Sequence, residues 1–194
     1  MILLWLAALA VQEDAEAVFR KFEKRYADAK SISVSLQCDM VEEGTTDKST
    51  VAGRLRIRPG DRFVMDLTTE FPGTRTRYRA RSDGKTTLSD PDPTGGAGTK
   101  TRPGTGRLFA AGLTRCGYAV LFPSIGNPGG ETAPDPEKLF TLSRFKRTDE
   151  GKEIVLEYRI SGTAFGDMDV RLRLTGDLVP KSRVSTARVQ GRTV

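Results

Sequence analysis

Apolar and charged residues alternate along several short segments of this chain, and this pattern constrains the fold more than any other feature. In residues 53–58, Leu55 and Ile57 share one face of an extended strand, while three arginines share the other face. A short turn leads into a second strand that carries Phe63 and Met65 on its apolar face. Such alternation is typical of antiparallel strands with one buried face and one solvated face.

The same alternation recurs in the second half of the chain, where Ile154, Leu156 and Leu172 lie opposite charged residues. The predicted strands are 31–41, 51–58, 62–67, 76–81, 140–147, 153–161, 167–175 and 181–189. Turn sequences rich in glycine, proline and aspartate separate many of them. We therefore expect one curved antiparallel sheet.

Two helices are predicted to cover the apolar face of this sheet, which gives an α+β fold. Residues 13–30 place apolar side chains at spacings of three and four, the pattern of an amphipathic helix. Residues 107–122 are apolar nearly all round and must be buried on most sides, as a plug or lid over the sheet. The apolar positions of that second helix include Leu108, Phe109, Leu113 and Val120.

The sequence contains no histidine and no arrangement of residues typical of a catalytic site. Asp90 and Asp92 form an acid pair that general acid–base catalysis could use, but turn formation is the favoured interpretation of their proline-rich segment. The glycine-rich residues 90–106 lack the lysine and serine pattern of a phosphate-binding loop. We therefore expect a protein that is not an enzyme.

The chain contains two cysteines, Cys38 and Cys116. They allow one disulfide if the protein is exported, and two separate buried thiols are an equally good interpretation. Two cysteines without any histidine are too few for a zinc site, which takes four ligands. We expect neither a metal nor another cofactor.

The net charge of +6 comes from 31 basic and 25 acidic residues, with the basic residues spread along the chain. The arginines on the polar faces of the predicted strands could hold phosphate groups of lipids or nucleic acids. A solvated outer face is the commoner explanation, because acidic residues are interspersed and few exposed aromatics are available for base stacking. We expect no nucleic-acid partner.

Residues 1–10 are uncharged and apolar, and they are far fewer than the roughly 20 residues needed to span a bilayer. Ala8-Leu9-Ala10 has the small-x-small form of a signal-peptidase site. We expect a signal-peptide-like segment over 1–10 and a single domain over 11–194, periplasmic or otherwise exported. The alternative is an apolar N-terminal helical turn that packs on the domain.

Several segments follow one another in a recognisable order. They are the helix 13–30 with its following strand, Gly53-Arg-Leu-Arg-Ile-Arg-Pro-Gly-Asp-Arg-Phe63, Ser82-Asp-Gly-Lys-Thr86 with Asp90-Pro-Asp92, and Asp177-Leu-Val-Pro-Lys-Ser-Arg183. In this order and spacing, over most of its length, the chain resembles the periplasmic lipoprotein carriers of the LolA/LolB-like superfamily.

The resemblance implies an incomplete, strongly curved β-barrel whose mouth is closed by helices, and an activity of sequestering lipid acyl chains. Lipid or lipoprotein acyl chains are then the expected ligands of a monomer, with a membrane-bound release or acceptor protein as a further partner. In such a half-barrel the apolar positions would line a cleft. They are Leu55, Ile57, Phe63, Met65, Leu108, Phe109, Leu113, Val120, Ile154, Leu156 and Leu172.

The cavity arginine of the family precedes a proline and corresponds by position to Arg58. Alternation groups Arg58 with Arg54 and Arg56, opposite Leu55, so we expect it to point outward unless a bulge before Pro59 re-aims it. A second hypothesis is a structural or protein-interaction module of the cell envelope. It would use the same fold with a filled core, and its arginine face would dock a partner.

Overall fold

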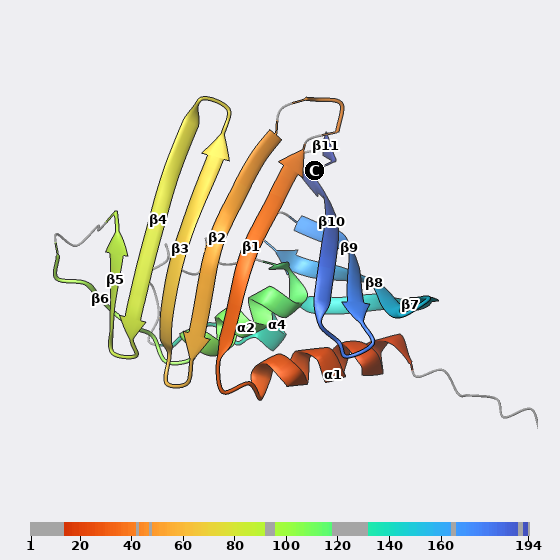
Figure 1. The fold of residues 1–194 in the computed structure, drawn as a ribbon, viewed down its shortest axis with the longest axis horizontal. Helices are drawn as coiled ribbons and strands as arrows, with labels where there is room; N and C mark the ends of the chain where they lie inside the picture. Colours follow the sequence, from red (N-terminus) through yellow and green to blue (C-terminus); the bar gives the residue numbers. More distant parts are fainter. Residues whose placement is uncertain are drawn as a thin grey trace, which may run out of the picture.

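The computed structural model describes residues 14–41, 43–46, 48–91, 96–117, 132–163, 166–189 and 192–193. These residues form an α+β fold in which strands predominate (Figure 1). In chain order the elements are α1 (Ala15–Ala27), β1 (Ile32–Val41), β2 (Lys48–Arg58), β3 (Arg62–Phe71), β4 (Thr74–Asp83), β5 (Thr86–Asp90), β6 (Thr99–Lys100), α2 (Thr105–Arg115), α4 (Pro136–Leu139), β7 (Thr141–Glu150), β8 (Glu153–Thr163), β9 (Gly166–Thr175), β10 (Pro180–Val189) and β11 (Arg192–Thr193).

The strands form two antiparallel sheets, and the expectation of one continuous sheet is corrected here. The first sheet has the order β1-β2-β3-β4-β5-β6, and the second has the order β11-β10-β9-β8-β7. Within each sheet, strands adjacent in the chain also pair in space, as hairpins with short turns do. The chain leaves the first sheet through α2 and α4 before β7 begins, so this hairpin ladder is interrupted there.

In the first sheet, the apolar side chains predicted to be buried lie on one face, and the arginines that alternate with them in β2 lie on the other face, as predicted. Leu55 pairs with Met65, and Ile57 pairs with Phe63, so these apolar side chains share one face. All four side chains are buried, whereas the arginines that alternate with them in β2 are exposed. We call the buried face of each sheet its inner face and the opposite face its outer face.

The helix α1 packs against the second sheet. Phe19 and Phe22 are buried among inner-face residues of β8 and β9, and the ring centroids of Phe19 and Tyr158 lie 4.8 Å apart. The helix is three residues shorter at its C-terminal end than the predicted span of 13–30. Tyr26, near that end, contacts the cores of both sheets, so α1 links them.

The helix α2 covers the inner face of the first sheet. Its C-terminal end is set by Gly117, which has a φ of 68° and so takes the left-handed conformation that commonly stops a helix. The predicted helix extended to residue 122, and residues 118–122 lie outside the described part of the chain. None of the helices in the described segments has the length and apolar character to cross a membrane.

Candidate functional site

The sheet positions predicted to line an apolar cleft lie in two packed cores. The buried positions of the first core are Leu55, Ile57, Phe63 and Met65. In the second core, Leu156 and Leu172 are buried, and Ile154 is half-buried against them. The sequence therefore identified inner-face residues correctly, while the structure divides them between the two sheets.

The α2 positions predicted for the same cleft fill the space over the first sheet. Phe109 is buried in the first core, where its ring meets that of Phe63 edge-to-face with centroids 4.9 Å apart. Leu108 is buried, and Leu113 is half-buried against the first core. Val120 lies outside the described residues. In this structure α2 occupies the place expected for an apolar ligand.

The N-terminus of α2 is held by Asp61, which lies in the turn between β2 and β3. Its Oδ2 accepts the N–H of Gly104 at 3.0 Å, and its Oδ1 accepts the N–H of Gly106 at 2.8 Å. These N–H groups have no partner within the helix, and a carboxylate beside them also complements the helix dipole. We call these two hydrogen bonds the N-terminal latch.

The C-terminus of α2 is held by Arg115, whose side chain is only 2% exposed. Its Nε donates to Glu23 of α1 at 2.5 Å, and an Nη donates to Glu137 of α4. The other Nη donates to the carbonyls of Pro136 and Phe140 at 3.1 and 3.2 Å. A buried guanidinium needs this full set of partners, because removal of a charge from water costs several kcal/mol. We call these contacts the C-terminal latch.

Two further side chains of the second sheet reach the same end of α2. The Tyr158 hydroxyl donates to the carbonyl of Arg115 at 2.9 Å, and an Nη of Arg183 donates to the carbonyl of Thr114. Burial raises the pKa of Tyr158 to about 12, so the phenol stays protonated and can donate this bond. The last carbonyls of α2 are therefore tied to β8 and β10.

A groove of about 730 Å³ runs along the solvent side of these contacts, between α1, α2 and the β2–β3 turn. Its basic lining residues are Arg20, Lys24, Arg58, Arg107 and Arg115. Its acidic lining residues are Glu23, Asp28, Asp61 and Glu137. Both latches thus face this groove, and solvent in the groove can reach the acidic groups that hold α2.

Arg58, the residue that matches the cavity arginine of the resembled family, is exposed and lines this groove. It pairs across the hairpin with Arg62, at the end of β2. Its position is therefore at the mouth beside α2 and outside the buried core of the first sheet.

Another segment highlighted in the sequence forms a turn. Residues 82–86 form the hairpin turn between β4 and β5, in which Asp83 Oδ1 accepts the N–H groups of Lys85 and Thr86 at 2.8 Å each. These backbone hydrogen bonds lower the pKa of the exposed Asp83. Asp90 is an exposed residue at the end of β5, and Asp92 lies outside the described residues.

Cys38 and Cys116 are both free thiols. Burial raises the pKa of Cys116 to about 12, so this thiol is protonated at neutral pH and is a poor nucleophile. Across the segments that the structure describes, no three cysteine or acidic side chains gather in a way that could hold a metal ion.

Sequence reasoning missed both latches. In the sequence, Arg115 is one of the few polar residues inside the predicted helix 107–122, and Asp61 belongs to the turn between two predicted strands. The signal available was an isolated charge within a segment that must be buried, because such a charge requires partners from elsewhere. The identity of those partners, Glu23 and Glu137, depends on how the helices pack.

The sequence was compared with models of known protein families and with curated proteins. No family model matches the chain, and no curated protein matches it.

Proposed function

We propose that this protein is a non-enzymatic carrier of lipid acyl chains, free or attached to lipoproteins, outside the cytoplasm. The two sheets would act as the walls of an incomplete, strongly curved barrel of the LolA/LolB-like type. The observation that carries the proposal is that a single short helix, α2, covers the apolar inner face of the first sheet and is tied down at both ends by polar latches.

An acyl chain would bind by taking the place of α2 on the inner face. Burial of one methylene contributes about 0.8 kcal/mol, so ten methylenes contribute roughly 8 kcal/mol. Withdrawal of Leu108, Phe109 and Leu113 from their packing costs roughly 1.5–3 kcal/mol for each side chain. The gain and this packing cost are similar in size, so the energy of the latches, which adds to the cost, would decide whether α2 or a ligand occupies the inner face.

The latches would set how readily α2 leaves. Loss of a helix N-cap costs about 1–2 kcal/mol, whereas disruption of a buried ion-pair network costs about 3–5 kcal/mol. The N-terminal latch of Asp61 is therefore the weaker one, and α2 would open from its N-terminal end. A membrane-bound release or acceptor protein could act at the groove, where both latches are accessible.

The test is titration of the purified chain with a fluorescent fatty acid, followed by displacement with unlabelled lipid. We expect binding at micromolar protein and a tenfold or greater gain in affinity for Phe109→Ala, because the variant weakens the competing helix by about 1.5–3 kcal/mol. Phe63→Arg should abolish uptake. The matched control is Val64→Ala on the outer face of the same strand, which should bind as the wild type does.

A second candidate function is a structural or protein-interaction module of the cell envelope. The observation that favours it is that both cores are filled, with Leu156 fully buried and Leu55 at 1% exposure. If the folded wild type and the folded Phe109→Ala variant both fail to take up the fatty acid, the carrier proposal is wrong and this second function is favoured.

A further inference from the structure

The outer faces of the two sheets carry arginines in very different electrostatic settings. On the second sheet each arginine of the central strands has an acidic partner. Arg159 bonds to Asp169 through two nitrogens at 2.8 and 2.9 Å, and Arg171 and Arg173 bond to Glu150 at 2.8 and 2.6 Å. Those charges are neutralised within the fold.

Five exposed arginines in the described part of the first sheet have no acidic partner; one of them, Arg62, donates its Nε to the Pro59 carbonyl, and the other four lie on β2 and β4. Among the residues that the structure describes, no acidic side chain forms an ion pair with any member of this set, which we call the arginine patch. The arginine patch consists of Arg54, Arg56, Arg58 and Arg81. Its members come from β2 and β4, which flank β3 in the sheet.

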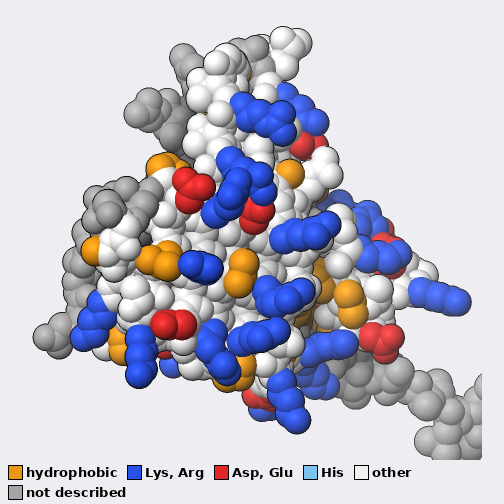
Figure 2. Space-filling model, turned by 60° about the vertical axis from the view of Figure 1, so that its left-hand side comes forward, with side chains coloured by type: hydrophobic (Ala, Val, Ile, Leu, Met, Phe, Trp, Pro, Cys, Tyr) orange, Lys and Arg blue, Asp and Glu red, His pale blue; other side chains and the backbone are white. Residues whose placement is uncertain are grey.

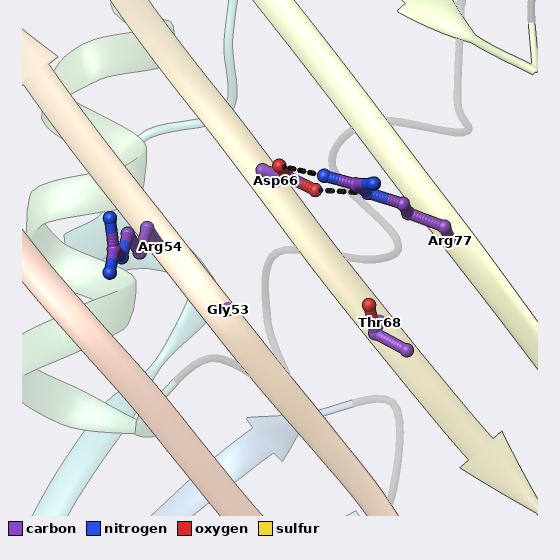
Figure 3. Close-up of a pocket in the computed structure, with 5 residues that line it drawn as sticks. All are labelled: Gly53, Arg54, Asp66, Thr68 and Arg77. Carbon is purple, nitrogen blue, oxygen red and sulfur yellow. Dashed lines mark hydrogen bonds and ion pairs between the residues drawn. The ribbon is translucent and has the colours of Figure 1, made fainter.

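The acid opposite Arg54 on this face is already occupied. Arg54 lies opposite Asp66 in the β2–β3 register, but both carboxylate oxygens of Asp66 accept from Arg77 at 2.6 and 2.8 Å. Figure 3 shows the Arg54 guanidinium turned away from that pair. A shallow hollow of about 250 Å³ lies between them, lined also by Gly53 and Thr68.

An exposed aliphatic side chain lies in the middle of the arginine patch. Val64 is 57% exposed, and its neighbours across the sheet are Arg56 on one side and Arg81 on the other. Beyond Arg81 comes Leu88 of β5, which is half-buried. Figure 2 turns the β4 and β5 side of the molecule forward and shows lysine and arginine side chains spread around single hydrophobic ones.

The arginine patch is small enough to contact one flat surface at once. Arg54 and Arg58 are about 13 Å apart along their strand, and β2 and β4 are about 10 Å apart across the sheet. Both separations exceed the Debye length of about 8 Å at physiological ionic strength, so the arginines are largely screened from one another and each can engage its own phosphate on an anionic surface.

We propose that the arginine patch docks the protein on an anionic phospholipid bilayer, with the guanidinium groups on lipid phosphates and Val64 against the interface. This inference goes beyond the proposed function and does not depend on it, because the inner faces of the sheets play no part. Guanidinium groups suit the site, since their fork of donors matches phosphate oxygens.

Nucleic acid also carries phosphates, but the composition of this face favours lipid. Outer-face positions of β1–β4 include no aromatic side chain that could stack on a base. Single-stranded nucleic acid binders combine basic grooves with aromatic platforms. An aliphatic residue surrounded by arginines fits the headgroup region of a membrane instead.

The experiment is co-sedimentation of the full chain with phosphatidylcholine vesicles, and with vesicles of phosphatidylcholine and phosphatidylglycerol in equal parts. We expect binding to the mixed vesicles only, and weaker binding as sodium chloride is raised. Each arginine near an anionic surface contributes about fivefold to partitioning onto that surface. The triple variant Arg54→Gln/Arg56→Gln/Arg81→Gln, which we call the patch variant, should therefore bind the mixed vesicles on the order of a hundredfold more weakly than the wild type. Arg58 is left intact because it also lines the groove beside α2.

The matched control is Arg144→Gln/Lys146→Gln/Lys152→Gln, which removes the same charge from exposed positions of the β7–β8 hairpin. It should bind vesicles within about threefold of the wild type, and all three proteins should melt at the same temperature. Equal losses in both variants, or no binding of the wild type to the mixed vesicles, would overturn the proposal. If the patch variant loses vesicle binding but still takes up fatty acid, docking on the bilayer is supported and the carrier function is shown to be independent of it.

A short DNA duplex and a single-stranded oligonucleotide serve as competing probes at physiological salt. We expect neither to displace the protein from the mixed vesicles at equal phosphate concentration. If the wild type binds an oligonucleotide more tightly than the vesicles, and the patch variant loses that oligonucleotide binding, the arginine patch binds nucleic acid. This result would refute docking on lipid.

Discussion

At the scale of single residues, Arg115 forms more hydrogen bonds to distant parts of the chain than any other side chain described at the candidate site. It is one of the largest fully buried side chains, and its partners come from α1, from α4 and from the residue that follows α4. Buried charges persist when each donor has an acceptor, as here. The residue thus fixes the end of α2 against three other parts of the chain.

We expect Arg115→Met to lower the free energy of unfolding by about 3–5 kcal/mol, because Glu23 Oε1, Glu137 and the carbonyl of Phe140 lose the donor that Arg115 supplies. Arg115→Lys should recover only part of the loss, since an ammonium group cannot reach all four acceptors in the guanidinium geometry. Urea unfolding followed by circular dichroism measures both. Arg107→Met, at an exposed position of the same helix, is the control and should change stability by less than about 0.5 kcal/mol.

Because the Cys116 thiol is buried, we expect the free energy of unfolding to fall at alkaline pH. Burial raises its pKa from 9.0 to about 12, so between these values the unfolded chain loses a proton that the folded chain keeps. The contribution of this thiol to the free energy of unfolding is therefore constant below pH 9. As the pH rises toward 12, this contribution falls by about 1.4 kcal/mol per pH unit. Cys116→Ala should show a shallower decline in urea unfolding across that range. An unchanged slope would contradict the burial of the thiol.

At the scale of elements, α2 is a short helix whose position depends on groups outside it. Its own N-cap residue is Gly104, which offers no side-chain acceptor, and Asp61 supplies the acceptors from a neighbouring turn. Isolated helices of this length are marginal in water, so α2 owes its stability to packing and to the latches.

We expect Asp61→Ala to lower stability by about 1–2 kcal/mol, the usual cost of losing a helix cap, and to speed amide hydrogen exchange in α2. Asp61→Asn should have a smaller effect, because Asn tolerates the φ of 58° and keeps one acceptor oxygen. Exchange in β8 and β9 serves as the internal reference and should not change. Equal exchange rates in α2 for all three proteins would show that Asp61 does not hold the helix.

At the scale of the whole molecule, two sheets with separate inner-face cores are joined by side chains of α1, β8 and β10. Tyr26 packs against both cores, and Tyr158 and Arg183 of the second sheet bond to the end of α2. The outer faces differ, since the second sheet has paired charges and the first has the arginine patch. The arginines of β8 and β9 are therefore neutralised within the fold, whereas the arginine patch on β2 and β4 presents positive charge to its surroundings.

We expect the two sheets to unfold in one cooperative transition, because α1 and α2 contact both halves. Phe109→Ala in the first core and Leu156→Ala in the second should each cost about 2–5 kcal/mol. Circular dichroism and tyrosine fluorescence should give one midpoint for each variant. Two separated transitions in either variant would show that the sheets fold independently.

The sequence by itself determined which residues face inward. Strand periodicity identified the inner faces of β2, β3, β8 and β9, and helical periodicity identified α1, because both signals repeat locally along the chain. The α+β class follows from these signals and is confirmed. They are local, so they do not specify which strands pair beyond a hairpin.

Only the tertiary structure decided that the strands form two sheets, that α2 lies on the first of them, and that Asp61 and Arg115 hold its ends. It also decided which arginines are neutralised. Arg54 and Arg159 have the same place in an alternating pattern, yet Asp169 pairs with Arg159 while Asp66 pairs with Arg77. Charge pairing depends on cross-strand neighbours, and these are brought together only when the sheet has formed.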